Sequence, residues 1–149
     1  MTKSGAAPLI VLVLFVFSGC ATLKNTDQDQ PQTVAQNLIE NYFAATNKRD
    51  LLMLTAYVTP DFEWISMVDG ERVVEVNSRE ALAETLRQYF TQYAHSTVAL
   101  EHLQVAGNFV AVNERSEWRD AKGEGYRTSL GIYELSDGRI RRVTYFLTR

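Results

Sequence analysis

The chain has 149 residues, which is enough for a single domain. Its hydrophobic fraction of 46% and charged fraction of 22% are typical of a globular protein that also carries an apolar leader. The formal charge of −3 at pH 7 argues against nucleic acid as a partner, because binding driven by counterion release requires a basic surface.

The first 19 residues have the order of a secretory signal peptide. Lys3 supplies the positive flank, the stretch from Leu9 to Phe17 is apolar, and Ser18-Gly19 supply the small residues before a cleavage site. The apolar stretch is too short to cross a hydrocarbon layer of about 30 Å as a permanent helix. We therefore expect residues 1–19 to be a signal peptide.

Cys20 follows this segment and is the only cysteine in the chain. The sequence Phe17-Ser18-Gly19-Cys20 resembles the lipobox of bacterial lipoproteins, with phenylalanine where leucine is usual. The resemblance implies lipidation of Cys20, with the membrane as a partner. Ala21 implies the periplasmic side of the outer membrane. The alternative is an uncleaved anchor helix with an incidental cysteine. The polar residues 20–32 are expected to form a flexible, lipidated tether.

From Thr33 onward, apolar residues recur at helical spacing through Phe43, which predicts a helix. Asp50 is placed to cap a second short helix that ends near Thr59-Pro60. Residues 61–68 and 71–76 then alternate in polarity around Asp69-Gly70, the dipeptide most typical of a tight β-hairpin.

A third helix is expected to begin at Asn77 or Ser78, with Leu82, Leu86, Tyr89 and Phe90 on one face. From Ser96 to the end, turn dipeptides separate four strands. This order predicts an α+β domain: a cone-shaped, strongly curved, mostly antiparallel sheet wrapped around three helices. The mouth of such a cone is a natural pocket.

Three passages of the domain at residues 33–149 carry a family resemblance. They are Tyr42-Phe43-Ala44-Ala45 through Asp50-Leu51, Thr59-Pro60-Asp61-Phe62, and Ser129 to Leu135 with Asp137-Gly138-Arg139-Ile140. The chain resembles the nuclear transport factor 2-like superfamily, in its SnoaL-like and ketosteroid-isomerase-like branch. The resemblance implies the cone fold, but not one activity, because this fold hosts enzymes and binding domains alike.

The resemblance also implies where isomerase residues would lie. Tyr42 matches the tyrosine that donates to the substrate oxyanion. The general-base aspartate is matched by Ser66, and the protonated aspartate on the penultimate strand is matched by Gly131. Neither serine nor glycine supplies the missing carboxyl group, so steroid-type isomerisation by the family mechanism is not expected.

Strand alternation, together with the apolar face of the first helix for Tyr42, predicts which side chains face the pocket. The expected lining is Tyr42, Phe62, Trp64, Ser66, Glu114, Ser116, Trp118, Arg127, Tyr133 and Tyr145. Glu114 is the only candidate acid or base, with Tyr42 as a donor. Burial would raise the pKa of Glu114, whereas an ion pair with Arg127 would lower it. A strand register shifted by one residue would instead put Asn113, Arg115 and Glu117 inside.

No metal site or cofactor is predicted, because His95 and His102 lie apart from any cluster of carboxylates. Three functions remain open. The first is a lipid-anchored domain that binds a small apolar or aromatic ligand without changing it. The second is a small hydrolase or isomerase-like lyase that uses Glu114 and Tyr42. The third is a non-enzymatic interaction module, with a homodimer as a further expectation.

Overall fold

The computed structural model describes residues 26–120 and 123–147, so the signal segment and Cys20 lie outside the described residues. The helices are α1 (Thr26–Lys48), α2 (Leu51–Ala56) and α3 (Arg79–Gln92). The strands are β1 (Val58–Val68), β2 (Glu71–Val76), β3 (Thr97–Ala106), β4 (Phe109–Asp120), β5 (Gly123–Ser136) and β6 (Arg139–Leu147).

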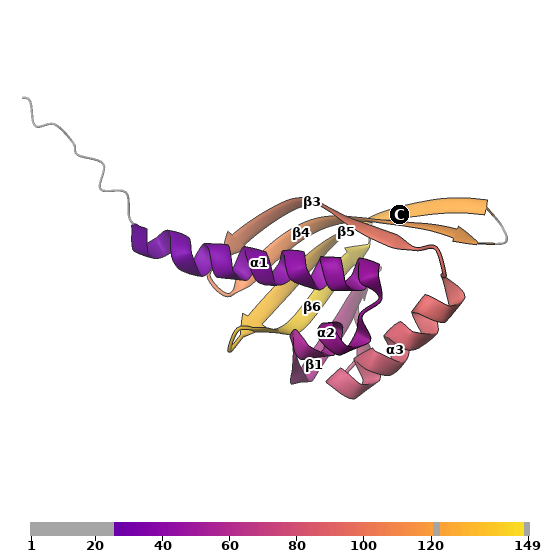
Figure 1. The fold of residues 1–149 in the computed structure, drawn as a ribbon, viewed down its shortest axis with the longest axis horizontal. Coiled ribbons are helices and arrows are strands. Elements are labelled where there is room, and N and C mark those ends of the chain that lie inside the picture. Colours follow the sequence, from indigo (N-terminus) through magenta and orange to yellow (C-terminus); the bar gives the residue numbers. More distant parts are fainter. Residues whose placement is uncertain (1–25, 121–122, 148–149) are drawn as a thin grey trace, which may run out of the picture.

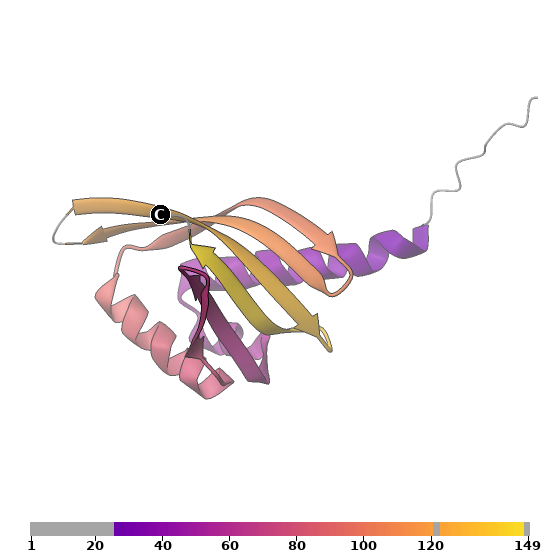
Figure 2. The same cartoon turned by 180° about the vertical axis from the view of Figure 1, so that it is seen from behind.

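The six strands form one curved sheet in the order β2-β1-β6-β5-β4-β3. Every neighbouring pair is antiparallel except β1 with β6, which is parallel. Helix α1 lies along the concave face of the sheet (Figure 1), and Figure 2 shows no helix on the opposite face. The predicted α+β cone with a mostly antiparallel sheet is confirmed.

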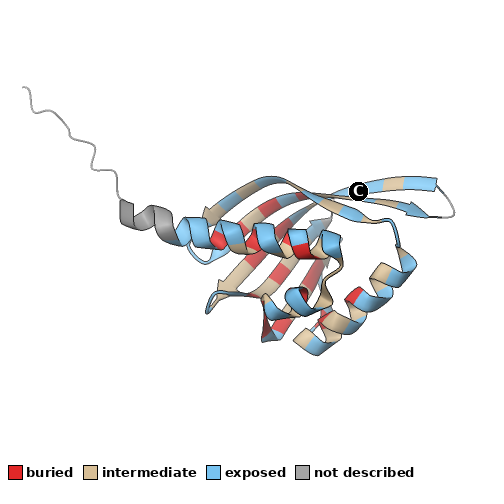
Figure 3. Ribbon diagram, viewed as in Figure 1, coloured by how far each residue is buried: buried red, intermediate tan, exposed pale blue. Residues whose placement is uncertain are grey.

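The core lies between α1 and the concave face (Figure 3). Ile39 and Phe43 are four residues apart and present one apolar side of α1 to the sheet. Val110 and Val112 are fully buried on β4, and Glu114 continues the same inward set. Asn113 is exposed between them. The register of β4 is therefore the one that places Glu114, and not Asn113, inside.

Two of the helix starts follow from local hydrogen bonds. Asp50 caps α2 by accepting a bond from the Met53 N–H at 3.1 Å, as its position in the sequence predicted. Ser78, and not Asn77, caps α3 by accepting from the Ala81 N–H at 3.1 Å. Helix α2 ends at Ala56, earlier than expected. Strand β1 then begins at Val58 and accommodates Pro60, which has no N–H, where its pairing with β6 is interrupted.

Helix α1 begins at Thr26, so the expectation of a tether without regular structure is wrong over residues 26–32. Apolar periodicity indicates where a helix packs, and this periodicity begins only at Val34. Residues 31–34 are exposed in the structure, so they belong to a helical extension that carries no packing signal.

The predicted hairpin is formed by β1 and β2. Asp69 and Gly70 both have positive φ, at 53° and 86°, as the two central residues of a type I′ turn require. Further along, Trp64 pairs with Val76 and the next residue, Ile65, pairs with Val74. Glu75 is thus an extra residue in β2, a β-bulge that turns this strand beside the open end of the cone.

Among the described residues, no helix is both long enough and apolar enough to cross a membrane.

Candidate functional site

A cavity of about 480 Å³ opens between α1, α3 and the concave face of the sheet. This volume is within the range of small-molecule sites. The side chains that line it include nine of the ten predicted ones: Tyr42, Trp64, Ser66, Glu114, Ser116, Trp118, Arg127, Tyr133 and Tyr145. Elements distant in sequence thus bring together the residues that alternation had assigned to one pocket.

Phe62 is the exception, and its predicted place in the pocket wall is corrected here. It is only 1% exposed and belongs to the hydrophobic core together with Leu54 and Leu82. Because α2 and α3 both pack on β1, they fill the space in front of Phe62. On this strand the cavity therefore begins at Trp64.

Five rings form the inner aromatic cluster, which surrounds the closed end of the cavity: Tyr42, Phe43, Trp64, Tyr133 and Tyr145. Tyr133 is the centre of this cluster, with its ring 6.4 Å from that of Tyr42 and 6.3 Å from that of Tyr145. Both pairs meet edge to face, the arrangement that the ring quadrupoles favour. The indole of Trp64 meets Tyr145 in the same way at 5.5 Å, and its N–H has no acceptor among the described residues.

Glu114 places a carboxyl group among these rings. The side chain is only 5% exposed, and the Tyr133 hydroxyl donates to its Oε1 at 2.8 Å. The Tyr133 and Tyr145 hydroxyls are 2.9 Å apart. Since a hydroxyl has one proton, a Tyr133 that donates to Glu114 accepts from Tyr145. The chain of donors therefore runs from Tyr145 through Tyr133 to the carboxylate.

Burial raises the pKa of Glu114 to about 7, while the Tyr133 hydroxyl, which donates to the carboxylate, and the Tyr145 hydroxyl behind it partly oppose the rise. Glu114 and Arg127 form no ion pair in the described part of the chain, so the alternative in which this pair lowers the pKa of Glu114 is wrong. Arg127 is exposed to solvent instead. Burial, followed by the charge of Glu114, raises the pKa of Tyr42, whose hydroxyl is therefore neutral at all physiological pH values.

Comparison with known proteins now decides the family. The sequence profile of the SnoaL-like domain matches residues 39–143, which is most of the chain and includes the elements that line the cavity. This chain belongs to the SnoaL-like domain family. No curated protein matches the SnoaL-like chain.

Solved structures share the fold of this SnoaL-like domain at low sequence identity. TerC, co-crystallised with polyporic acid, has a TM-score of 0.65 at 17% identity, over 77% of this chain and 92% of its own. A putative ketosteroid isomerase from Kribbella flavida has a TM-score of 0.66 at 20% identity, over 78% of this chain and 79% of its own. An LEH-like epoxide hydrolase from M. tuberculosis has a TM-score of 0.64 at 18% identity, over 78% of this chain and 84% of its own. These likenesses establish the nuclear transport factor 2-like fold and leave the activity open.

The SnoaL-like cavity holds its carboxyl group beside Gly131, the position where the isomerase resemblance places a protonated aspartate. A Cβ at Gly131 would lie 2.7 Å from the Glu114 Oε1 and 2.9 Å from the Tyr133 ring. The absence of a side chain at Gly131 therefore gives the carboxyl group of the neighbouring strand its space. Glu114 pairs with Ser129 in the sheet, two residues from Gly131.

The mouth of the cavity is lined by a second set of rings, the mouth aromatic cluster of Tyr89, Tyr93 and Trp118. The rings of Tyr89 and Tyr93 are 5.0 Å apart, and that of Trp118 is 6.5 Å from Tyr93. Strand alternation does not place Tyr89 and Tyr93 in the pocket, because they belong to α3 and its C-terminal end. Their spacing of four residues puts both on one side of this helix, and that is the signal that could have found them.

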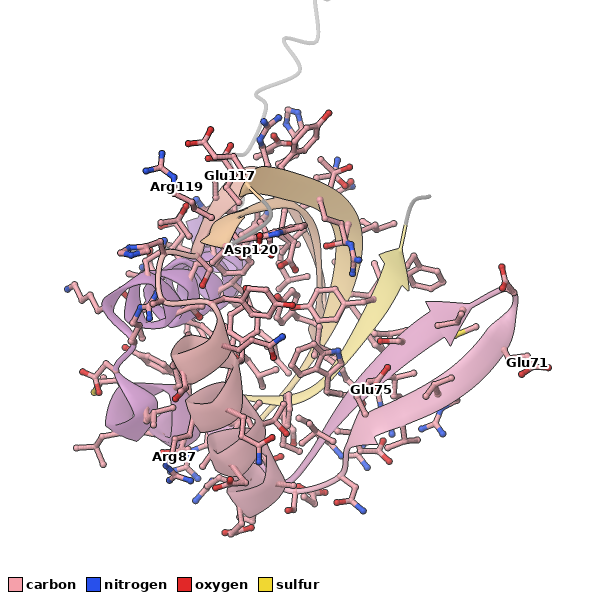
Figure 4. All side chains as sticks on the ribbon, turned by 90° about the vertical axis from the view of Figure 1, so that its right-hand side faces the viewer. Glu71, Glu75, Arg87, Glu117, Arg119 and Asp120 are labelled. Atoms are coloured by element: carbon pink, nitrogen blue, oxygen red, sulfur yellow. The ribbon has the colours of Figure 1, made fainter. Side chains whose placement is uncertain are left out.

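Glu75 and Arg127 add charge at this mouth, and both side chains are exposed. Figure 4 shows Glu75 on the side of β2 that faces α3, whereas Glu71 lies at the tip of the hairpin and points away from the cavity. Within the described residues, no group of three or more His, Cys, Asp or Glu side chains is arranged to hold a metal ion.

Proposed function

We propose that this SnoaL-like domain binds a small, largely apolar or aromatic molecule and does not convert it. The observation that carries the proposal is the open cavity of about 480 Å³, lined by eight aromatic side chains and a few polar groups. Such a combination is typical of small-molecule sites, in which apolar walls supply affinity and the polar groups fix orientation. An interaction module has no use for this volume and would gain stability by filling it.

The structural neighbours support binding more than any one reaction. TerC was co-crystallised with polyporic acid, and the neighbours named above include a putative isomerase and an epoxide hydrolase. The carboxylates expected for the family isomerase are replaced by Ser66 and Gly131 in this chain. The cavity is thus present without that pair of carboxylates, which favours binding over the isomerase reaction.

Filling the cavity tests the proposal. Titration calorimetry of the full chain with 2-naphthylmethanol, a neutral aromatic probe, is expected to show saturable binding. Ser129→Phe introduces a ring into the cavity and should weaken binding by about tenfold or more, equivalent to about 1.4 kcal/mol. Thr128→Phe is the matched control, because Thr128 is the preceding, exposed residue of the same strand. Equal loss in both variants, or no binding by the unaltered chain, contradicts the proposal.

A catalytic function is the second candidate, and Glu114 is the observation that favours it. A carboxyl group with a pKa of about 7 in a cavity is suited to move a proton at neutral pH, with Tyr42 as a neutral donor across from it. Hydrolysis of epoxides or isomerisation of cyclic enones by the full chain, abolished in Glu114→Gln, would establish it. Turnover that survives this substitution rules out Glu114 as the acid or base.

We further propose that lipid on Cys20 anchors the domain at the periplasmic side of the outer membrane. The support is the signal-like segment before Cys20 and the absence of any second cysteine. Cys20→Ser should abolish incorporation of labelled palmitate and move the protein out of the membrane fraction, because the thioether to lipid cannot form. Palmitate labelling that persists in Cys20→Ser contradicts the anchor.

A further inference from the structure

The charges inside the cavity are unbalanced. Glu114 is buried at the closed end and Glu75 lies at the mouth, against a single arginine, Arg127, which is exposed there. Within the described residues, no lysine, arginine or histidine forms an ion pair with Glu114. A buried carboxylate ordinarily has a paired cation, so the counter-ion of Glu114 is missing from the protein itself.

The hydrogen bonds around Glu114 are arranged for its charged form. The titratable groups packed against it are Tyr42 of α1, Tyr133 of β5 and Tyr145 of β6, and none of them carries positive charge. The hydroxyl chain from Tyr145 through Tyr133 ends on the carboxylate oxygen and stabilises negative charge there. Burial without a nearby cation is what opposes ionisation of Glu114, and a positively charged ligand beside it would favour the ionised form.

The aromatic walls suit the same kind of ligand. The inner and mouth aromatic clusters together present five tyrosines, two tryptophans and a phenylalanine to the cavity. The faces of such rings attract a cation through their quadrupole, and this attraction is strongest when the cation is removed from water. Aromatic rings combined with a carboxylate are therefore the chemistry that recognises substituted ammonium groups.

We propose that the ligand of this cavity is an organic cation, an amine or quaternary ammonium carried on an apolar or aromatic body. The cationic group lies against Glu114 and the faces of Tyr42 and Trp64, and the body extends past Tyr93 and Trp118 to the mouth. The inference rests on the proposed binding function and adds the charge of the ligand to it.

Two matched probes test the sign of this charge. Titration calorimetry of the full chain at about pH 8 should show (2-naphthylmethyl)trimethylammonium binding about tenfold more tightly than 2-naphthylmethanol, since only the first carries a charge. Lowering the pH to about 5.5 protonates Glu114 and should remove most of this preference, whereas binding of the neutral alcohol should persist. The quaternary group itself does not titrate, so the change reports on the protein.

The variants separate the two carboxylates. Glu114→Gln keeps the shape of the side chain and should remove most of the cation preference and all of its pH dependence. Glu75→Gln should reduce the preference only partly, because its charge is exposed. Glu71→Gln, on the same strand but outside the cavity, should leave it unchanged (Figure 4).

The two proposals fail in different ways. Binding of the alcohol without any preference for the cation overturns the cationic ligand and leaves the binding function intact. A cation preference that is equally strong in Glu114→Gln also overturns this inference. Failure of both probes to bind overturns the binding function as well.

Discussion

Glu114→Gln is expected to make the protein more stable above pH 7, although it removes a buried charged group. The pKa of Glu114 is about 7 in the folded chain against an ordinary value of 4.5, so between these values the folded state holds more protons than the unfolded one. Stability of the unaltered protein therefore falls as pH rises through this window. The shift corresponds to about 3 kcal/mol of unfolding free energy, all of it lost above pH 7.

Urea unfolding at about pH 4.5, 6 and 8 measures this slope. From pH 4.5 to pH 8 the unfolding free energy of the unaltered chain should fall by up to about 3 kcal/mol relative to that of Glu114→Gln. The neutral amide of Gln can still accept the hydrogen bond from Tyr133. Glu71→Gln, at the exposed tip of the hairpin, is the control and should keep the slope of the unaltered protein. Parallel curves for Glu114→Gln and the unaltered protein would show that folding does not raise the pKa of this carboxyl group.

Gly131→Ala is expected to cost about 3 kcal/mol of unfolding free energy, from one added methyl group. That Cβ would lie 2.7 Å from the Glu114 Oε1, 2.9 Å from the Tyr133 ring and 3.1 Å from the Tyr145 ring. Contacts so short force these groups apart. Since all three belong to one buried network, the hydrogen bond from Tyr133 to Glu114 is strained or lost.

Gly125→Ala is the matched control on the same strand. Its Cβ would also collide with a ring, lying 2.7 Å from Cε2 of Trp118. Trp118 lies at the mouth and is only partly buried, so it has room to turn, and the expected cost is below about 1 kcal/mol. Thermal unfolding of both variants compares them directly. Equal destabilisation would mean that the network around Glu114 yields as readily as the partly buried ring of Trp118.

The course of the chain could be predicted because its signals are local. Asp69-Gly70 defines a hairpin through positive φ, Asp50 caps a helix, and alternation on β4 turns Glu114 inward. Each of these signals depends on residues that are only a few positions apart in the sequence. The first seven residues of α1 gave no such signal, because their sequence is polar and has no apolar period.

The contents of the site could be predicted only in part. Alternation named the side chains of the inner wall, but it did not show that helices cover Phe62. It also could not show that Arg127 stays in solvent while Tyr133, itself bonded to Tyr145, donates to Glu114. Those outcomes depend on how far each side chain reaches in three dimensions. The space beside Gly131 is the clearest case, because its use depends on a residue of the neighbouring strand.

The length and direction of α1 determine how an anchored molecule would face its surroundings. The helix begins at Thr26 and enters the cone from the end opposite to α3 and the β4–β5 hairpin, where the cavity opens (Figure 1). Sixteen residues of helix separate Thr26 from Tyr42, a rise of about 24 Å. A lipid on Cys20 would thus anchor the domain from the end opposite to the mouth of the cavity. The mouth would point into the aqueous compartment, and ligand would arrive from solution rather than out of the bilayer.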